Sequence, residues 1–251
     1  MTTLKGYFFS FLTALYVFIY IVFVVIRGFL GFDLKGAIRY RQDLGRAIIR
    51  INGIQREVKG SVPEGTYLFI SNHRTYMDPV MECPEAAFIP VVMNEVASWP
   101  IMGRGVRQTG VVYVKRESKS SRAATRVAMA KALDDGYSII IYPEGGTNDL
   151  PTTKTFREGA FKIAADKGVP IIPIAVDYKD PSFYWTNGKS FAAHVIHTFS
   201  NKMEAKVAFG KPIVGNDSQE LLQQTQAWID QELIRMRKEW NLDNGELKME
   251  N

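Results

Sequence analysis

The sequence predicts an α/β protein: a layered sheet, mostly parallel or mixed, flanked by helices and preceded by a hydrophobic helical segment that anchors the chain in a membrane. Two observations predict this. From about Ile54 onward, short apolar runs of strand length alternate with segments of helical composition, which is typical of layered α/β folds. Before that point, Tyr7 to Ile26 has no formal charge. As a helix it is about 30 Å long, close to the thickness of a bilayer's hydrocarbon core.

Residues 1–52 are therefore expected to form a membrane anchor. A signal peptide is the main alternative, but its apolar region is shorter and ends at a small-residue cleavage site, which is not evident before Arg27. A second, basic amphipathic helix is expected from Ala37 to Ile51, compatible with lying in the membrane interface. The apolar helix can either span the membrane or enter one leaflet, and both readings stay open.

A cluster of basic residues follows the apolar helix. Such a cluster favours the cytoplasmic face of the inner (plasma) membrane and can hold anionic lipid headgroups. Its members are Arg27, Lys35, Arg39, Arg41, Arg46 and Arg50.

The elements behind the anchor are expected in alternation. The strands are Ile54–Lys59 at a sheet edge, Tyr67–Ser71 in the core, Ala87–Val92, Gly110–Val114, Ser138–Tyr142, Ile171–Val176, Ala193–Thr198 and Ala205–Phe209. The helices are one near Asp78, Ser120–Asp134 closed by Gly136, Phe156–Lys167 closed by Gly168, and the amphipathic Ser218–Trp240. His194 and His197 fall in one expected strand, where a spacing of three points them to opposite faces and argues against a metal site.

Charge and cysteine usage narrow the class of partner. The chain carries 31 Lys and Arg against 26 Asp and Glu, and such an excess suits nucleic acid, anionic lipid or an anionic substrate. The sequence has no zinc-ligand spacing, no RNA-binding signature and no long lysine-arginine run, so no nucleic-acid partner is expected. Cys83 is the single cysteine; it cannot form an internal disulfide and is interpreted as a buried structural thiol.

The stretch Asn72-His73-Arg74-Thr75-Tyr76-Met77-Asp78 carries the first chemical signal. Histidine accepts a proton near neutral pH, and a carboxylate can fix its tautomer and stabilise the imidazolium. A spacing of five does not place two side chains on one helical face. The pair can meet only if the chain turns sharply between them, as where a strand enters a helix. The alternative is a surface loop histidine and a helix-capping aspartate.

Three further segments follow in order. Gly110–Arg116 is a strand ending on two cations, Ile139–Asp149 is a strand running into a glycine-rich turn, and Val169–Val176 is a proline-bounded strand. With the first stretch, they resemble the glycerolipid acyltransferase family, which includes bacterial 1-acylglycerol-3-phosphate acyltransferases. That family carries Asn-His-x-x-x-x-Asp, a strand ending in Arg, a Pro-Glu-Gly turn and a Val-Pro-x-x-Pro strand. The resemblance covers roughly Ile54 to Val176, and the combination is specific although each piece alone is not.

The resemblance implies that residues 53–251 form an acyltransferase domain. Such a domain transfers a fatty acyl group from acyl-CoA or acyl carrier protein to the free hydroxyl of 1-acylglycerol 3-phosphate, giving phosphatidic acid. His73 is then the general base and Asp78 its orienting partner, with the substrate hydroxyl as nucleophile. No metal or redox cofactor is expected, because no step requires one.

The resemblance also assigns residues that hold the acceptor. Arg116, preceded by Lys115, matches the family's phosphate-binding arginine. Glu144 matches the motif glutamate, which binds an acceptor hydroxyl or shapes the pocket, and Gly145 and Gly146 allow close backbone approach.

The glycine-rich turn departs from the family's usual pattern. Many members read Pro-Glu-Gly-Thr-Arg-Ser, whereas this chain reads Pro143-Glu144-Gly145-Gly146-Thr147-Asn148, so Thr147 stands where a phosphate-binding Arg is expected. Arg157 and Lys154 are candidates to compensate. The departure does not change the predicted reaction, but it leaves the identity of the acceptor undecided.

Three alternatives to the leading function remain. One is an acyltransferase for another lyso-lipid acceptor. A second, of a different class, is a membrane-docked lipid-binding protein with a degenerate site. The third is hydrolysis of the thioester, with water in place of the alcohol at the same base.

Overall fold

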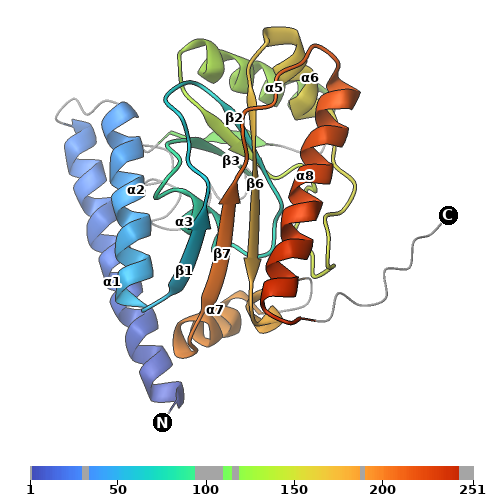
Figure 1. Ribbon diagram of the computed structural model, residues 1–251. Helices are drawn as coiled ribbons and strands as arrows, with labels where there is room; N and C mark the ends of the chain where they lie inside the picture. The colour runs from blue at the N-terminus through green and yellow to red at the C-terminus, as the bar shows by residue number, and fades with distance from the viewer. Residues whose placement is uncertain (1, 30–33, 94–109, 115–118, 187–189, 243–251) are drawn as a thin grey trace.

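The computed structural model describes residues 2–29, 34–93, 110–114, 119–186 and 190–242, and within them the chain forms a layered α/β fold around a seven-stranded sheet (Figure 1). The strand order is β1-β7-β6-β2-β5-β3-β4. The β6–β7 pair is antiparallel, and the other five pairs are parallel. The predicted fold class is thereby confirmed.

The elements have the following bounds. The strands are β1 (Gln55–Lys59), β2 (Leu68–Ser71), β3 (Ile89–Met93), β4 (Val112–Val114), β5 (Ile139–Ile141), β6 (Ile171–Tyr178) and β7 (Glu204–Phe209). The helices are α1 (Thr2–Phe29), α2 (Leu34–Ile51), α3 (Asp78–Glu82), α5 (Lys119–Asp134), α6 (Gly159–Lys167), α7 (Phe191–Ser200) and α8 (Ser218–Glu239), with a short 3₁₀ turn at Pro181–Phe183.

Helices cover both faces of the sheet, so its central strands are apolar on both sides. Leu68 and Ile70 of β2 pack with the side that carries α5, α6 and α8, whereas Phe69 packs with the side that carries α3 and the end of α2. All eight residues of β6 are buried. Burial on both faces produces continuous apolar runs rather than alternation, which is why the core strands could be found from sequence.

One expected strand is wrong. Residues 193–198 belong to helix α7, which packs against α1. The buried His194 and Thr198 are four residues apart, as on one helical face, and Gly6 of α1 lies so close that a Cβ there would overlap Ser200. A β-branched composition favoured a strand, and the tertiary contact with α1 overrides that preference.

Because residues 193–198 are helical, the two histidines of α7 lie close together. His194 and His197 are one helical turn apart, and their ring centroids are separated by 6.2 Å. They therefore do not point to opposite faces, as they would in a strand. The Nδ1 of His194 lies 3.2 Å from the hydroxyl of Tyr76, and the Nε2 of His197 lies 2.9 Å from Oγ of Ser182. Within the described ranges, no group of three or more His, Cys, Asp or Glu is placed to hold a metal ion.

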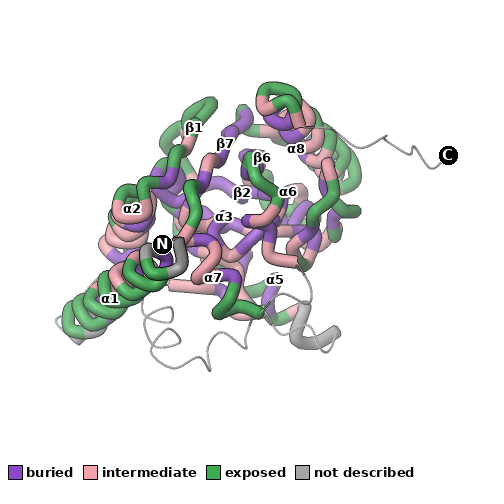
Figure 2. The backbone as a smooth tube through the Cα atoms, turned by 90° about the horizontal axis from the view of Figure 1, so that it is seen from below, coloured by how far each residue is buried: buried purple, intermediate pink, exposed green. Residues whose placement is uncertain are grey.

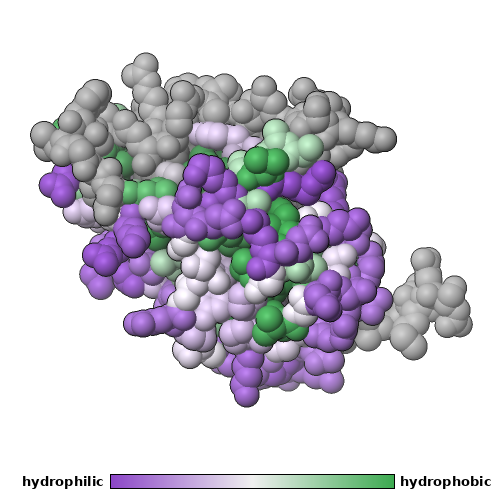
Figure 3. All heavy atoms as spheres, turned by 90° about the horizontal axis from the view of Figure 1, so that it is seen from above, coloured by the Kyte–Doolittle hydropathy of each residue, from purple (hydrophilic) through white to green (hydrophobic). Residues whose placement is uncertain are grey.

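Helix α1 lies at the side of the molecule, and exposed residues run along its length (Figure 2). Many of these exposed residues are large and apolar. Gly6–Val24 is the one stretch of the described chain long and apolar enough, by length and composition, to cross a membrane. On the part of the face seen from above in Figure 3 that described residues form, hydrophilic residues predominate and hydrophobic ones show between them. The exposed apolar residues of α1 are Leu4, Tyr7, Phe8, Phe11, Leu15, Tyr16, Phe18, Ile19, Val22, Phe23 and Ile26.

Two arginines of α2 bind the protein's own backbone. Arg41 donates to the carbonyl of Gly110 at 2.9 Å and to that of Phe88, and Arg46 donates to the carbonyl of Pro84 at 2.6 Å. These bonds attach α2 to the segments that begin β3 and β4 and to the end of α3. Part of the basic cluster therefore docks the helix rather than facing lipid, while Arg39 and Arg50 remain exposed.

We expect Arg41→Met to destabilise the protein. Methionine keeps much of the side-chain bulk but leaves the carbonyls of Phe88 and Gly110 without this donor, which costs about 2–5 kcal/mol of unfolding free energy. Urea unfolding in detergent, followed by tryptophan fluorescence, measures the change. Arg39→Met removes the same charge at an exposed position, and equal stability of the two variants would contradict the docking role.

Candidate active site

The candidate site lies at the carboxyl ends of three adjacent strands. His73 follows β2, Tyr142 follows β5, and Tyr178 ends β6. Strand β2 lies between β5 and β6 and is parallel to both. The carboxyl ends of parallel strands share one edge of a sheet, where side chains from distant parts of the chain meet.

A histidine–aspartate pair forms the centre of the site. Nδ1 of His73 lies 2.7 Å from Oδ2 of Asp78. The same Oδ2 accepts hydrogen bonds from the backbone N–H groups of Arg74 at 2.7 Å and Thr75 at 2.9 Å. These bonds stabilise the turn between β2 and α3. Asp78 is fully buried and the His73 side chain is 22% exposed. A proton on Nδ1 leaves Nε2 of this partly exposed ring as an acceptor.

Asn72 fixes the end of β2 against β6. Its side-chain nitrogen donates to the carbonyl of Val176 at 2.8 Å, and its side-chain oxygen accepts the N–H of Val176 at 2.8 Å. The amide thus continues the backbone pairing of the two strands by one step. His73, the next residue, is held at the strand end.

Tyr142 forms one wall of the histidine site. Its ring stacks on His73 with centroids 4.3 Å apart and planes at 23°. Its hydroxyl donates to Oε2 of Glu82 at 2.6 Å, and Ser71 donates to the other oxygen at 2.5 Å. Burial, reinforced by the nearby Asp78 carboxylate, raises the pKa of Glu82 well above its ordinary value. The site therefore pairs Asp78 with a second carboxyl group that favours its neutral form.

Glu144 joins the loop after β5 to the loop after β2. One carboxylate oxygen accepts the N–H of His73 at 3.0 Å, and the other accepts the N–H of Lys154 at 3.0 Å and the side-chain amide of Asn148. Burial raises the pKa of this carboxyl group. Both oxygens are engaged by the protein, which favours shaping the pocket over binding an acceptor hydroxyl, the two roles left open by the sequence.

The glycine-rich turn carries an exposed cation. Gly145 has φ +75°, and the guanidinium of Arg157 lies across it, so that an added Cβ would come within 2.7 Å of Arg157 Cζ. Arg157 is exposed, and its side chain has no hydrogen bond or ion pair to the described part of the chain. Thr147 donates its hydroxyl to the carbonyl of Trp185, and Nζ of Lys154 donates to the carbonyl of Thr147 at 3.1 Å.

Two of the predicted substrate-binding residues cannot be placed. Lys115 and Arg116 lie outside the described residues. Of the remaining predicted set, His73, Asp78 and Glu144 are joined by hydrogen bonds. Gly146 is exposed, and an added Cβ there would meet no atom within 4 Å.

A buried ionic cluster around Arg74 adjoins the site. Arg74 is fully buried; its Nη1 donates to the Asn148 side chain at 2.6 Å and to the carbonyl of Leu150 at 2.7 Å. Its Nε lies 3.4 Å from Oδ1 of Asp177, and its guanidinium lies over the Tyr184 ring at 5.1 Å. Sequence reasoning missed these residues, although the polar Asp177 in an otherwise apolar strand was a usable signal.

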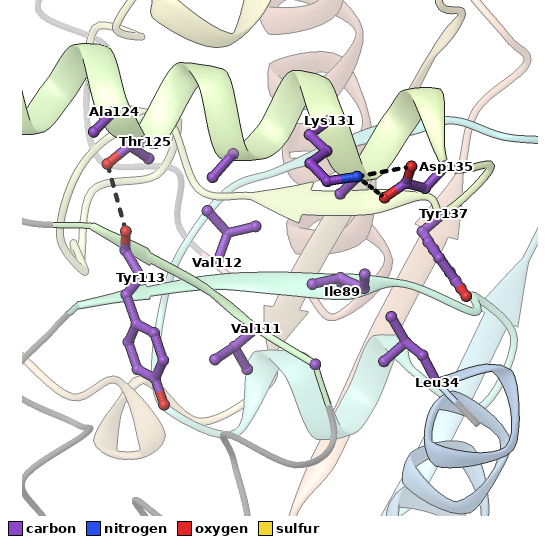
Figure 4. Close-up of a pocket in the computed structure, with 13 residues that line it drawn as sticks. Leu34, Ile89, Val111, Val112, Tyr113, Ala124, Thr125, Lys131, Asp135 and Tyr137 are labelled. Atoms are coloured by element: carbon purple, nitrogen blue, oxygen red, sulfur yellow. Dashed lines mark hydrogen bonds and ion pairs between the residues drawn. The ribbon is translucent and has the colours of Figure 1, made fainter. Parts of the chain in front are cut away.

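A cavity of about 640 Å³ lies between α5 and the strands β3 and β4, at the β4 edge of the sheet (Figure 4). Its walls are mainly apolar, and the Lys131–Asp135 ion pair, at 2.8 Å, borders it. Neither His73 nor Asp78 lines it. The reaction centre suggested by the side chains and this cavity are thus separate features.

The geometry defines a class of protein: an α/β fold with a buried-carboxylate–histidine pair at the carboxyl edge of its sheet. Residues 53–177, about half of the chain, match the family model described as Acyltransferase. The chain belongs to this acyltransferase family, and the predicted resemblance is confirmed.

Relatives and a solved structure agree with this assignment. A lyso-ornithine lipid O-acyltransferase from Rhodobacter capsulatus is 27% identical over 68% of this chain and 66% of its own length. A 1-acyl-sn-glycerol-3-phosphate acyltransferase from Borreliella burgdorferi is 32% identical over 57% of this chain and 60% of its own length. The matches thus span less than two thirds of these relatives. The crystal structure of the 1-acyl-sn-glycerophosphate (LPA) acyltransferase PlsC from Thermotoga maritima, at 16% identity, covers 94% of this chain and 98% of its own with a TM-score of 0.74, which shows the fold.

We expect neighbouring glycine substitutions to differ. Gly145→Ala puts a side chain in the left-handed region and against Arg157, which lowers the unfolding free energy by about 1–2 kcal/mol. Gly146→Ala meets no atom within 4 Å and stays within about 0.5 kcal/mol of wild type. Urea unfolding compares the two. Equal losses would contradict the conformational requirement at Gly145.

We expect Glu82→Gln to flatten the pH dependence of stability. The folded-state pKa of Glu82 lies above its ordinary 4.5, so the folded chain holds an extra proton between the two values and loses stability as pH rises through that window. Glutamine cannot ionise, and the loss in stability from pH 5 to pH 8 is therefore smaller in the variant. Unfolding at the two pH values measures this, with the exposed Glu64→Gln as control. The same loss in Glu82→Gln and wild type would exclude the effect.

Proposed function

We propose that the protein is a membrane-associated O-acyltransferase that acylates the free hydroxyl of a lysophospholipid, with 1-acylglycerol 3-phosphate as the leading acceptor and phosphatidic acid as product. The observation that carries the proposal is the 2.7 Å contact between Nδ1 of His73 and the buried carboxylate of Asp78. This contact orients a partly exposed imidazole so that its second nitrogen can accept a proton.

The reaction needs a base and no covalent enzyme intermediate. The acceptor hydroxyl attacks the thioester carbonyl of acyl-CoA or acyl carrier protein while Nε2 of His73 takes its proton. Asp78 stabilises the imidazolium that forms. Collapse of the tetrahedral intermediate breaks the C–S bond, and the imidazolium returns the proton to the departing thiolate. A positioned base of this kind contributes about 10²–10⁴ in rate.

The acceptor's headgroup is the open part of the proposal. Thr147 presents a hydroxyl that donates to the carbonyl of Trp185, where a family arginine would offer a cation. Arg157 lies across Gly145 at the same turn and is the candidate to bind a phosphate or carboxylate. A lyso-ornithine lipid is the second candidate acceptor. Two observations favour it: the motif arginine is missing, and the Rhodobacter relative is named a lyso-ornithine lipid O-acyltransferase.

Residues 1–52 are proposed to hold the enzyme at the membrane. Helix α1 exposes its apolar side chains to the surroundings rather than to the sheet, and Arg39 and Arg50 of α2 are exposed cations beside it. This arrangement supports attachment to an anionic, cytoplasmic membrane face. It suits an enzyme whose acceptor and product are both lipids.

The experiment is acyl transfer by purified protein in detergent micelles. Labelled palmitoyl-CoA or palmitoyl-acyl carrier protein is supplied with lysophosphatidic acid, other lysophospholipids and lyso-ornithine lipid in turn. We expect labelled phosphatidic acid from wild type and a fall of about 10²–10⁴ in kcat in His73→Ala, because the base is lost. His197→Ala on α7 is the matched histidine control and is expected to keep activity.

Each other outcome changes the proposal in a defined way. Product from lyso-ornithine lipid alone keeps the mechanism and replaces the acceptor. Free fatty acid released at the same rate without any acceptor identifies a thioester hydrolase. No His73-dependent product with either donor and any acceptor contradicts the enzyme and leaves a membrane-docked lipid-binding protein.

A further inference from the structure

Tyr178 reaches the catalytic pair from a distant part of the chain. It is the last residue of β6 and is fully buried. Its hydroxyl donates to Oδ1 of Asp78 at 2.8 Å. The His73 contact is made by the other carboxylate oxygen, Oδ2. Asp78 therefore stands between an imidazole on one side and a phenol on the other.

The hydrogen bonds to Asp78 divide unevenly between its two oxygens. Oδ2 accepts from His73 and from the backbone N–H groups of Arg74 and Thr75. At Oδ1, the donor found among the described residues is the hydroxyl of Tyr178. Backbone donors cannot be removed by substituting their side chains, but the Tyr178 hydroxyl can. Among the described residues, it is the one side-chain donor besides His73 that binds this carboxylate.

The charged and titratable groups near this pair come from four segments. They are Arg74 in the turn after β2, Glu82 on α3, Tyr142 and Glu144 in the loop after β5, and Asp177 beside Tyr178 at the end of β6. Burial, with the charge of Asp78 adding to it, raises the pKa of Tyr178 well above its ordinary value. Tyr178 thus keeps its proton throughout the working pH range and acts only as a donor.

We propose that Tyr178 is a positioning residue that, within the acyl transfer proposed above, sets the strength of the His73 base by drawing part of the Asp78 charge away from the imidazole. Asp78 stabilises the imidazolium by its negative charge. Each donor on Oδ1 weakens that stabilisation and keeps the imidazole neutral, and therefore able to accept a proton, at lower pH. Tyr178 acts through Asp78 and does not touch the reacting atoms.

The test compares two buried tyrosines. Tyr178→Phe removes the donor to Asp78. The acid limb of the kcat/KM profile is expected to move to higher pH by about 0.5–1 unit, with a fall of about three- to tenfold in kcat at neutral pH and KM unchanged. Tyr184→Phe is the matched control, because Tyr184 is equally buried but donates to Asp177 at 2.6 Å. A purely structural role predicts that both variants lose stability and neither moves the acid limb.

A second substitution avoids the loss of a hydrogen bond. Replacing Tyr178 with 3-fluorotyrosine keeps the geometry and makes the phenol a stronger donor, so the acid limb is expected to move to lower pH, opposite to Tyr178→Phe. In an Asp78→Asn background, Tyr178→Phe is expected to cause no further shift. An acid limb that stays in place in both folded Tyr178 variants overturns the proposal.

A measurement independent of turnover separates this inference from the proposed function. The chain has three histidines, and isotope-labelled histidine with a His73→Gln reference assigns the His73 ring signals in micelles. The midpoint of their pH titration is expected to rise in Tyr178→Phe and to stay in place in Tyr184→Phe. That result without any acyl transfer supports the coupling and rejects the enzyme. Acyl transfer by wild type, together with an unmoved His73 midpoint in Tyr178→Phe, supports the proposed enzyme and rejects the coupling.

Discussion

The carboxylate of Asp78 is the group on which the site depends. It binds the imidazole of His73, caps the turn that leads from β2 into α3, and accepts the hydroxyl of Tyr178 from the end of β6. The turn at residues 73–75 and the distant end of β6 therefore converge on two oxygen atoms. Because the group is fully buried, losing any of these donors leaves charge without solvent to compensate it. The fold thus requires the same ionised carboxylate that the chemistry requires.

Two neighbouring acidic residues, Asp78 and Glu82, lie in different electrostatic environments. Asp78 is surrounded by four donors, whereas Glu82, one helical turn later, meets two hydroxyl groups and a neighbouring negative charge. The first environment stabilises a charge and the second disfavours one. Tyr142 connects the two, since its hydroxyl bonds Glu82 while its ring stacks on His73. The imidazole is therefore held by the Asp78 carboxylate through Nδ1 and by the Tyr142 ring across its face.

Much of the fold was predictable because the core strands are apolar on both faces, and the strand at Tyr67–Ser71 and the helix end at Gly168 appear where expected. The segment at residues 193–198 was not, since its helical form depends on contact with α1. The spacing of His73 and Asp78 implied a sharp turn between them. Tyr178 could not be found in this way, because a contact between residues 100 positions apart depends on which strands are neighbours, and no local pattern encodes that.

Helix α7 links the site mechanically to the N-terminal helix. It packs against α1, and the segment just before it is tied to the site, where the N–H of Trp185 donates to the carbonyl of Arg74 and its carbonyl accepts from Thr147. A bilayer that holds α1 would therefore fix the height and tilt of the histidine above the lipid surface through α7. Within the proposed function, such an arrangement would make immersion depth a form of substrate selection, because only acceptors whose hydroxyl rises to that height would reach His73.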